Sequence, residues 1–305
     1  MKLAIIVVSW NTSELLAACL KSVYAYPPQC DFEMWVVDNA SKDDSVAMVQ
    51  QHFPQVRLIV NEANVGFAQA NNQAICDSDS EYVLLLNPDT EVKPGAIQHL
   101  IDFIEAHPKV GATGSRLLNP DGSLQISCHP MPTLAREFWR MFYMDDFFPY
   151  GRYPMRRWDM ETPRDVDVIQ GASFLLRRTV LNTVGFLDDT YFMYSEEVDL
   201  CFRLQKAGWR LYWVPQSQVT HYGGQSTRQV AQKMFIELYR GKVIFFRKHY
   251  GALAANLYKS ILFLAALPRI VFAPLFLPLQ SKPKREALQR LAQFYRRLVV
   301  ELPRL

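Results

Sequence analysis

The feature that most constrains this fold is a series of short, continuous apolar runs that alternate with helical patterns. The runs cover residues 3–9, 35–37, 56–60 and 82–86, and apolar residues recur at helical spacing over 14–24 and 67–75. Strands that are apolar on both sides are typical of a mostly parallel sheet covered by helices. The alternation therefore predicts an α/β fold with a mostly parallel central sheet and flanking helices.

Polar side chains follow each of the four predicted strands, just beyond its carboxyl end. Ligands bind at that edge of such sheets, so four polar strand ends together predict a binding site. Each residue alone has a second explanation, because Asn and Asp are also ordinary turn residues and helix caps. The candidate residues are Ser9, Asn11, Asp38, Asn64, Asn87 and Asp89.

The net charge of +3 conceals two segments of opposite sign. Residues 1–227 carry 18 Lys and Arg against 27 Asp and Glu, whereas residues 228–305 carry 15 against 3. We interpret the segments as an acidic α/β domain, 1–227, and a basic helical tail, 228–305. A cation would help an acidic domain to bind a phosphorylated ligand, and a basic tail suits an anionic surface. Drift of surface charge is the alternative explanation.

The cysteines and the N-terminus bear on the cellular compartment. Five scattered cysteines without a CxxC pair favour a reducing compartment over a disulfide framework or a zinc site. The apolar N-terminus lacks a small-residue cleavage site and runs directly into the polar residues 11–14. We therefore interpret it as a buried strand and not as a signal peptide.

The tail contains two different segments. Residues 230–250 form a predicted amphipathic helix rich in Lys and Arg. Residues 261–279 are strongly apolar but are interrupted by Arg269 and three prolines, whereas a spanning helix needs about 20 apolar residues. We expect this run to lie in the membrane interface or to enter it partly, flanked by basic anchors. The alternative is that it packs on the soluble domain as core.

The strand at 82–86 ends in Asn87-x-Asp89. Two oxygen-bearing side chains at this spacing can reach one cation from an extended strand end. Mg²⁺ and Mn²⁺ prefer oxygen ligands, and Mn²⁺ also accepts imidazole. Such a cation would neutralise a departing diphosphate, which sugar transfer from a nucleotide-diphosphate donor requires.

Five further motifs accompany Asn87-x-Asp89: VVSWN at 7–11, VVDNAS at 36–41, NEANVGFA at 61–68, QGA at 170–172 and YFMYSEEVDLCFR at 191–203. Together they resemble the family-2 inverting glycosyltransferases of the GT-A fold. Among these, they are most similar to the rhamnosyltransferase-like members that build bacterial surface polysaccharides. The resemblance covers roughly residues 3–225. It implies a GT-A domain with a Rossmann-like sheet, and we expect a membrane-associating helical tail to follow it.

The resemblance also assigns residues to the donor site. The family carries a DxD metal motif here, so Asp89 is implied as the direct ligand of Mg²⁺ or Mn²⁺ and Asn87 as a weaker or water-mediated one. Asp38 is implied near the nucleobase, where a carboxylate can accept an imide N–H. A glycine near the diphosphate would allow a close backbone approach. The remaining contacts to nucleoside and diphosphate are expected from Ser9, Asn11, Asn64 and Gly66.

The acidic cluster Glu196-Glu197-x-Asp199 resembles the family's Glu-Asp motif, whose second member is taken as the general base. That position is Glu197 here, one methylene longer than the usual Asp. If a helix already begins at Glu196, then Glu196 and Asp199 share a face while Glu197 points elsewhere. Acidic residues in a first helical turn are also favoured by the helix dipole without any catalysis. A neighbouring acid could raise the pKa of the base.

Two more residues have alternative roles. His221 lies in the segment Thr-His-Tyr-Gly-Gly, and some family members use a His in such a setting as a further metal ligand. A lone His is more often a hydrogen-bonded structural residue. Arg203 either contacts a phosphate or pairs with Glu196 or Asp199 on the same predicted helix.

The resemblance implies inverting transfer of a sugar, by preference rhamnose, from a nucleotide-diphosphate donor to a hydroxyl of a polyprenyl-linked glycan. We expect a dTDP-sugar ahead of a UDP-sugar, no nucleic-acid partner, and a cytoplasmic protein held peripherally on the inner face of the cell membrane. A nicotinamide dehydrogenase is excluded because the turn after the first strand lacks glycine. The alternative is a non-catalytic sugar-nucleotide-binding or membrane scaffold protein, since Asn87 and Glu197 depart from the family pattern.

Overall fold

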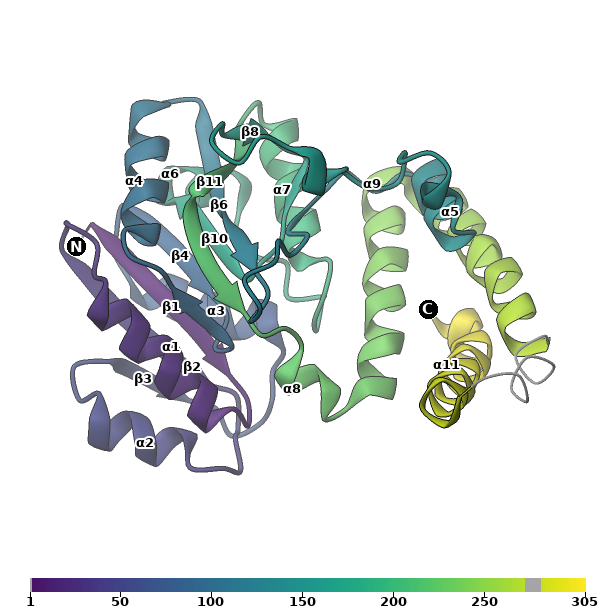
Figure 1. Ribbon diagram of the computed structural model, residues 1–305, viewed down its shortest axis with the longest axis horizontal. Coiled ribbons are helices and arrows are strands. Elements are labelled where there is room, and N and C mark those ends of the chain that lie inside the picture. The colour runs from purple at the N-terminus through teal and green to yellow at the C-terminus, as the bar shows by residue number, and fades with distance from the viewer. Residues whose placement is uncertain (1, 272–280) are drawn as a thin grey trace. The chain divides into compact units, whose positions relative to one another are not determined.

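The computed structural model describes residues 2–271 and 281–305 (Figure 1). The chain forms two compact units. The larger unit contains residues 1–131, 154–192 and 196–229, and the smaller unit contains residues 132–153, 193–195 and 230–305. Besides the C-terminal tail, the smaller unit therefore includes the segment 132–153, which lies inside the predicted first domain.

A nine-stranded sheet forms the centre of the larger unit, in the order β3-β2-β1-β4-β10-β6-β11-β5 with β8 paired to β11. The first four strands along this order are parallel, as are β6 and β11. β10, β5 and β8 run antiparallel to their partners. The α/β class is confirmed, but the sheet is mixed because β5 and β10 are reached through loops and not crossover helices. The strands are β1 (Leu3–Ser9), β2 (Phe32–Asp38), β3 (Arg57–Val60), β4 (Tyr82–Leu86), β5 (Thr90–Val92), β6 (Val110–Leu118), β8 (Arg164–Asp165), β10 (Ser173–Arg177) and β11 (Arg210–His221).

Helices cover both faces of this sheet (Figure 1). Leu3, Ile5 and Val7 of β1 join one hydrophobic cluster with α1, α2 and α4, and α3 also contacts β1. All seven residues of β1 are buried, which explains why its sequence is continuously apolar. The helices are α1 (Ser13–Ala25), α2 (Ser45–His52), α3 (Phe67–Asp77), α4 (Ala96–Ala106), α6 (Arg178–Val184), α7 (Glu196–Lys206) and α8 (Gln225–Arg228). A two-stranded sheet pairs β7 (Cys128–His129) with β9 (Val168–Ile169), and η2 (Met155–Arg157) is a 3₁₀ turn.

The smaller unit is helical. It consists of α5 (Leu134–Met141), η1 (Met144–Asp146), α9 (Ala231–Val271), α11 (Lys282–Glu301) and η4 (Leu302–Arg304). α9 is interrupted at Gly251, whose φ of 87° and ψ of 172° are not helical. The helix predicted over 230–250 is thus confirmed, and it ends at this glycine. Of the apolar run 261–279, residues 261–271 continue α9, and residues 272–279 lie outside the described part of the chain.

Candidate active site

The carboxyl ends of neighbouring strands place several predicted site residues along one edge of the sheet. The parallel register pairs Ser9 with Asp38, and Asp38 with Val60. Asp38 is 1% exposed, and its Oδ2 accepts the Ser41 backbone N–H at 2.9 Å. Its Oδ1 has no hydrogen-bond partner among the described residues. A buried carboxylate oxygen without a partner is costly, so this atom is suited to accept an N–H from a ligand.

Ser9 and Asn11 form hydrogen bonds that hold the loops at this edge. The hydroxyls of Ser9 and Thr12 are 3.1 Å apart. Asn11 has a positive φ of 51°, and its backbone N–H donates to Ser41 Oγ at 2.9 Å. The Asn11 side-chain oxygen accepts the Lys42 N–H at 2.7 Å. Both residues therefore shape the rim of the site through contacts within the protein.

A second network holds the loop that precedes α3. Asn64 Oδ1 accepts from Asn39 Nδ2 at 3.1 Å and from the Gly66 N–H at 3.0 Å. The buried Asn39 also accepts at Oδ1 from Asn61 Nδ2. Gly66 has a φ of 90°, and a Cβ at this position would overlap the carbonyl oxygen of Phe192. The Gly66 backbone thus lies close to Phe192, and its approach to a diphosphate stays a prediction.

Asp89 and His221 come together although 132 residues separate them in sequence. β5 pairs with β11 so that His221 lies opposite Thr90, directly after Asp89. His221 Nε2 is 3.3 Å from Asp89 Oδ1, with side-chain exposures of 5% and 8%. The side-chain nitrogen of Asn87 lies 3.4 Å from the same Nε2. The three predicted residues therefore converge at Nε2 of His221.

Gln125 fixes the orientation of this imidazole, and no motif in the sequence marks it as a site residue. Its Oε1 lies 2.6 Å from His221 Nδ1, while its Nε2 donates to the His221 carbonyl at 3.1 Å and to Asn119 Oδ1 at 2.9 Å. Because the amide nitrogen serves two oxygen acceptors, Oε1 accepts from Nδ1–H. In the neutral ring, Nε2 then directs a lone pair toward Asp89. That arrangement calls for a proton or a cation between the two atoms.

The donor set fits a divalent cation that is only partly held by protein. Among residues 2–271 and 281–305, no three His, Cys, Asp or Glu side chains gather as a complete metal site. Mg²⁺ in phosphate-transferring sites is commonly held by one or two carboxylates together with substrate phosphates and water. Asp89 and His221 would supply two ligands to such an ion, and an outer hydrogen bond like that from Gln125 commonly orients a metal-binding His.

The acidic cluster lies in the first turn of α7, which begins at Glu196. Glu196 and Asp199 are buried, whereas Glu197 is only partly buried. Asp199 Oδ2 accepts from Arg203 Nε at 2.7 Å. The Arg203 guanidinium also donates to the carbonyls of Val184, Gly185 and Phe186. Asp199 and Arg203 are thus a structural pair, and Glu197 is the more accessible acid of the cluster.

The side chains of Glu196 and Glu197 interact, and this interaction affects the pKa of Glu196. Burial raises the pKa of Glu196 well above its ordinary value, and the charge of Glu197 and a side-chain hydrogen bond between the two raise it further. Burial therefore favours the protonated form of Glu196, and in that form its O–H can donate to the Glu197 carboxylate.

The segment 170–172 links the acidic cluster to the strand end that carries Asn87. The Asn87 N–H donates to the Ala172 carbonyl at 3.0 Å. A Cβ built on Gly171 would lie 3.9 Å from Glu197 Cβ and 3.7 Å from the Phe67 ring at the start of α3. The structure therefore brings the motifs at 66–68, 87–89, 170–172 and 196–199 into one continuous region.

Polar and acidic side chains at the carboxyl ends of the strands of such a sheet are typical of a nucleotide-binding enzyme, and comparison with known proteins shows which family this chain belongs to. Residues 4–199 match the model of Glycosyl transferase family 2, and the chain belongs to this family. The GT-A fold and the family predicted from the sequence are confirmed.

Two relatives illustrate the similarity. Over 206 residues the chain is 34% identical to the N-acetylglucosaminyl-diphospho-decaprenol L-rhamnosyltransferase of Mycobacterium tuberculosis, covering 63% of this chain and 67% of the relative. Over 241 residues it is 27% identical to the rhamnosyltransferase WbbL of Escherichia coli, covering 76% and 87%.

Solved structures show the same fold. The mannosyltransferase PcManGT of Pyrobaculum calidifontis, solved with GDP-Man and Mn²⁺, superposes with a TM-score of 0.57 at 17% identity, covering 99% of this chain and 86% of that one. GalNAc-T7, solved with UDP, GalNAc and Mn²⁺, superposes over 72% of this chain and 44% of that one, with a TM-score of 0.56 at 16% identity. At these identities the likeness concerns the fold alone.

Proposed function

We propose that this glycosyltransferase transfers rhamnose from a nucleotide-diphosphate donor to a hydroxyl of a lipid-linked glycan, with inversion, in the synthesis of a bacterial surface polysaccharide. The names of the two relatives above support the sugar and the lipid-linked acceptor. The observation that carries the proposal is the link, through residues 170–172, between the Asp89–His221 pair and the partly exposed Glu197.

The donor would bind at the carboxyl ends of β1, β2 and β4. Asp38 Oδ1 would accept the imide N–H of the base, because it is buried and lacks another partner among the described residues. A dTDP-sugar is our preferred donor and a UDP-sugar the next; both bases offer the same imide. Ser9, Asn11, Asn64 and Gly66 would hold the surrounding loops in place.

Asp89 and His221 would hold a Mg²⁺ or Mn²⁺ ion, with Asn87 contributing directly or through water. When bound, that cation supplies positive charge for the departing diphosphate. Gln125 keeps Nε2 of His221 available by accepting a hydrogen bond from Nδ1.

Glu197 would act as the general base. Its carboxylate takes the proton of the acceptor hydroxyl while that oxygen bonds to the anomeric carbon on the face opposite the leaving diphosphate. The bond from the anomeric carbon to the diphosphate oxygen breaks in the same step. Glu196, whose protonated form is favoured by burial, would donate a hydrogen bond to Glu197 and orient it. Asp199 is assigned a supporting role, because its carboxylate already forms an ion pair with Arg203.

The acceptor's lipid anchor would place the reaction at the membrane. We therefore propose a cytoplasmic protein, peripherally bound to the inner face of the cell membrane through its basic tail. By length and composition, α9 is the helix in the described part of the chain that could also cross a membrane.

The test is a transfer assay with dTDP-rhamnose, UDP-sugars and a polyprenyl-diphosphate-linked N-acetylglucosamine acceptor, with the product and its anomeric configuration determined. Wild-type protein should give an inverted product. Glu197→Gln should lower turnover at least about a hundredfold and leave the donor affinity within about threefold, since only proton transfer is lost. Glu81→Gln, at the opposite end of β4, is the matched control and should retain activity.

Two results would contradict the proposal. Turnover by Glu197→Gln equal to wild type would exclude Glu197 as the base. Nucleotide binding without turnover on any lipid-linked acceptor would favour a non-catalytic binding protein.

A further inference from the structure

Exposed large apolar side chains are concentrated in the smaller unit. Among the described residues, fifteen large apolar side chains are exposed. Thirteen of them belong to this unit, and only Tyr26 and Val60 belong to the larger one. Single exposed apolar residues are ordinary, but a cluster on one unit marks an interaction surface.

The second half of α9 is apolar on two faces. One face, with Ala255, Tyr258 and Leu262, is buried in the core of the smaller unit. The other face exposes apolar side chains at helical spacing, and Leu253 is 74% exposed. A surface helix of a soluble protein normally directs polar side chains to solvent, whereas this second face exposes apolar ones. The exposed stripe consists of Leu253, Leu257, Leu264, Leu267 and Val271.

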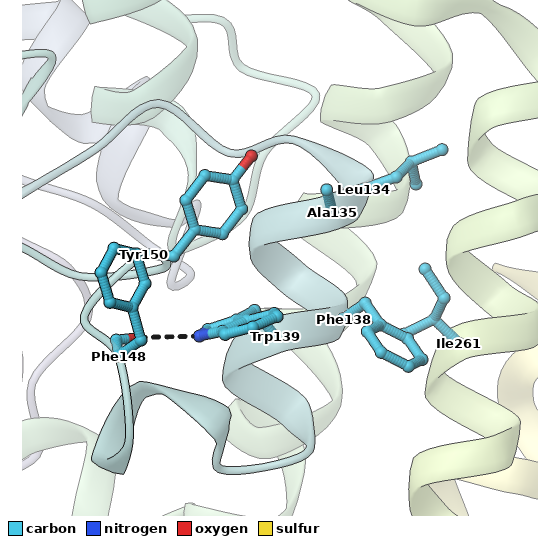
Figure 2. Close-up of a pocket in the computed structure, with 7 residues that line it drawn as sticks. All are labelled: Leu134, Ala135, Phe138, Trp139, Phe148, Tyr150 and Ile261. Carbon is cyan, nitrogen blue, oxygen red and sulfur yellow. Dashed lines mark hydrogen bonds between the residues drawn. The ribbon is translucent and has the colours of Figure 1, made fainter.

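An apolar groove adjoins this stripe. Figure 2 shows its lining side chains, contributed by α5, the segment that follows α5, and Ile261 of α9. The groove has a volume of about 610 Å³ and is lined by aliphatic and aromatic side chains. Ile261 lies between Leu257 and Leu264 on the helix, four and three residues away, so groove and stripe are continuous. The lining residues are Leu134, Ala135, Phe138, Trp139, Phe148, Tyr150 and Ile261.

The segment after α5 presents aromatic side chains to solvent. Phe147 is 91% exposed and Phe148 is 63% exposed. The Trp139 indole N–H donates to the Phe148 carbonyl at 2.8 Å, which ties the segment to α5 (Figure 2). Exposed Phe side chains of this kind can insert at the boundary between lipid headgroups and acyl chains.

The charge of the smaller unit selects an anionic partner. α11 buries Ala292, Tyr295 and Leu298 and exposes basic side chains along the rest of its length. Its single exposed acid is Glu286. The exposed basic residues are Lys282, Lys284, Arg285, Arg290, Arg296 and Arg297. An apolar surface next to a basic helix is complementary to a membrane with anionic lipids.

A buried ionic cluster indicates that the unit lies on the membrane and does not span it. The Glu137 carboxylate of α5 is 2.8 Å from Lys242 Nζ and 2.9 Å from the Arg140 guanidinium, and it accepts from the Tyr258 hydroxyl at 3.4 Å. Tyr258 is on the buried face of the second half of α9. If this half spanned the bilayer, the cluster would enter the hydrocarbon, where charged groups are costly.

We propose that the smaller unit is a monolayer-binding module for anionic phospholipid, in which the exposed stripe of α9 and the aromatic segment 147–150 insert among the lipids and α11 contacts their phosphates. The inference deepens the membrane location proposed above and rests on it. It names the residues that form the membrane-binding surface, and these include the internal segment 147–150, which lies outside the C-terminal tail. Its test uses vesicles without glycan acceptor or donor, so it can fail while sugar transfer stands.

The test is sedimentation of the full-length protein with vesicles of phosphatidylglycerol and phosphatidylethanolamine. Leu257→Asp with Leu264→Asp should lower the partition coefficient at least about tenfold, because two leucine side chains lose their apolar contact. Val60→Asp, the same change on an exposed residue of the larger unit, should bind like wild type. Replacing Lys284, Arg285 and Arg290 with Gln should weaken binding by about fivefold per charge, and added salt should do the same.

Several results would overturn the proposal. Equal binding by the Leu257/Leu264 variant and wild type would do so, as would binding that appears only when a polyprenyl lipid is added. A dimer that this variant dissociates, with no vesicle binding by wild type, would assign the surface to a second copy of the chain. Phe147→Ser keeps the test valid if the double variant fails to fold, because that ring is almost fully exposed; it should weaken vesicle binding, and unchanged binding would count against the aromatic segment.

Discussion

Replacing Gln125 with methionine tests whether the His221 imidazole is held in place for a metal ion. Methionine keeps the length of the side chain but removes the acceptor 2.6 Å from Nδ1 and the donors to the His221 and Asn119 oxygens. The ring can then rotate or carry its hydrogen on Nε2. Loss of such outer hydrogen bonds commonly lowers metal affinity by about ten- to a hundredfold, or about 1.4–2.7 kcal/mol.

Gln125→Glu is the matched variant. It keeps an oxygen acceptor for Nδ1–H but loses the donors to His221 and Asn119. If ring orientation is what Gln125 contributes, Gln125→Glu should bind metal within about threefold of wild type. If Gln125 only supports the loop, both variants should bind the metal ion equally weakly.

The assay is calorimetric titration of Mn²⁺ into protein saturated with nucleoside diphosphate, with unfolding temperatures measured alongside. We expect Gln125→Met to weaken Mn²⁺ binding at least about tenfold, as His221→Ala should. The reasoning is refuted if Gln125→Met binds Mn²⁺ as tightly as wild type while His221→Ala binds it more weakly.

Two further predictions concern stability. Gly66→Ala should lower the free energy of unfolding by at least about 2 kcal/mol, because strain at positive φ is joined by overlap with the Phe192 carbonyl. Gly122→Ala is the control: its φ is 81° but its Cβ would lie in open space, so it should lower the free energy of unfolding in urea clearly less. Equal losses for the two variants would contradict the packing argument. The folded-state pKa of Glu196 is raised above its ordinary 4.5, so this group binds more protons in the folded chain and its contribution to stability falls as pH rises above that value. Glu196→Gln lacks this loss, so its free energy of unfolding relative to wild type should increase from pH 5 to 7 by up to about 1.4 kcal/mol per pH unit. The raised pKa of Glu196 would be contradicted if the free energies of unfolding of the two proteins, measured in urea, changed in parallel with pH.

The sequence predicted those parts of the site that follow directly from strand ends. Asp38 and Asp89 stand at fixed positions after apolar runs, and parallel strands bring their carboxyl ends to one edge. The position of the acidic cluster also followed from local rules, since the helix does begin at Glu196 and buries Glu196 with Asp199. Arg203 pairs with Asp199, one of the partners considered.

Other parts depend on long-range pairing that no local pattern encodes. Gln125 and His221 are 96 residues apart, and they meet because β11 runs beside β6, whose chain continues into the loop that carries Gln125. The mixed character of the sheet arises in the same way, from loops that return β5 and β10 in the antiparallel direction. The grouping of the segment 132–153 with the tail likewise depends on long-range packing, between α5 and α9.

The donor site is tested most directly by calorimetric titration of dTDP and UDP into the purified protein, with and without Mn²⁺ or Mg²⁺. We expect metal-dependent binding, with dTDP preferred, that Asp89→Ala weakens at least about tenfold and Asp79→Ala, at the other end of β4, leaves unchanged. Binding of neither nucleotide under any metal condition, or equal binding by Asp89→Ala and wild type in Mn²⁺, would contradict a metal-assisted sugar-nucleotide site at this edge of the sheet.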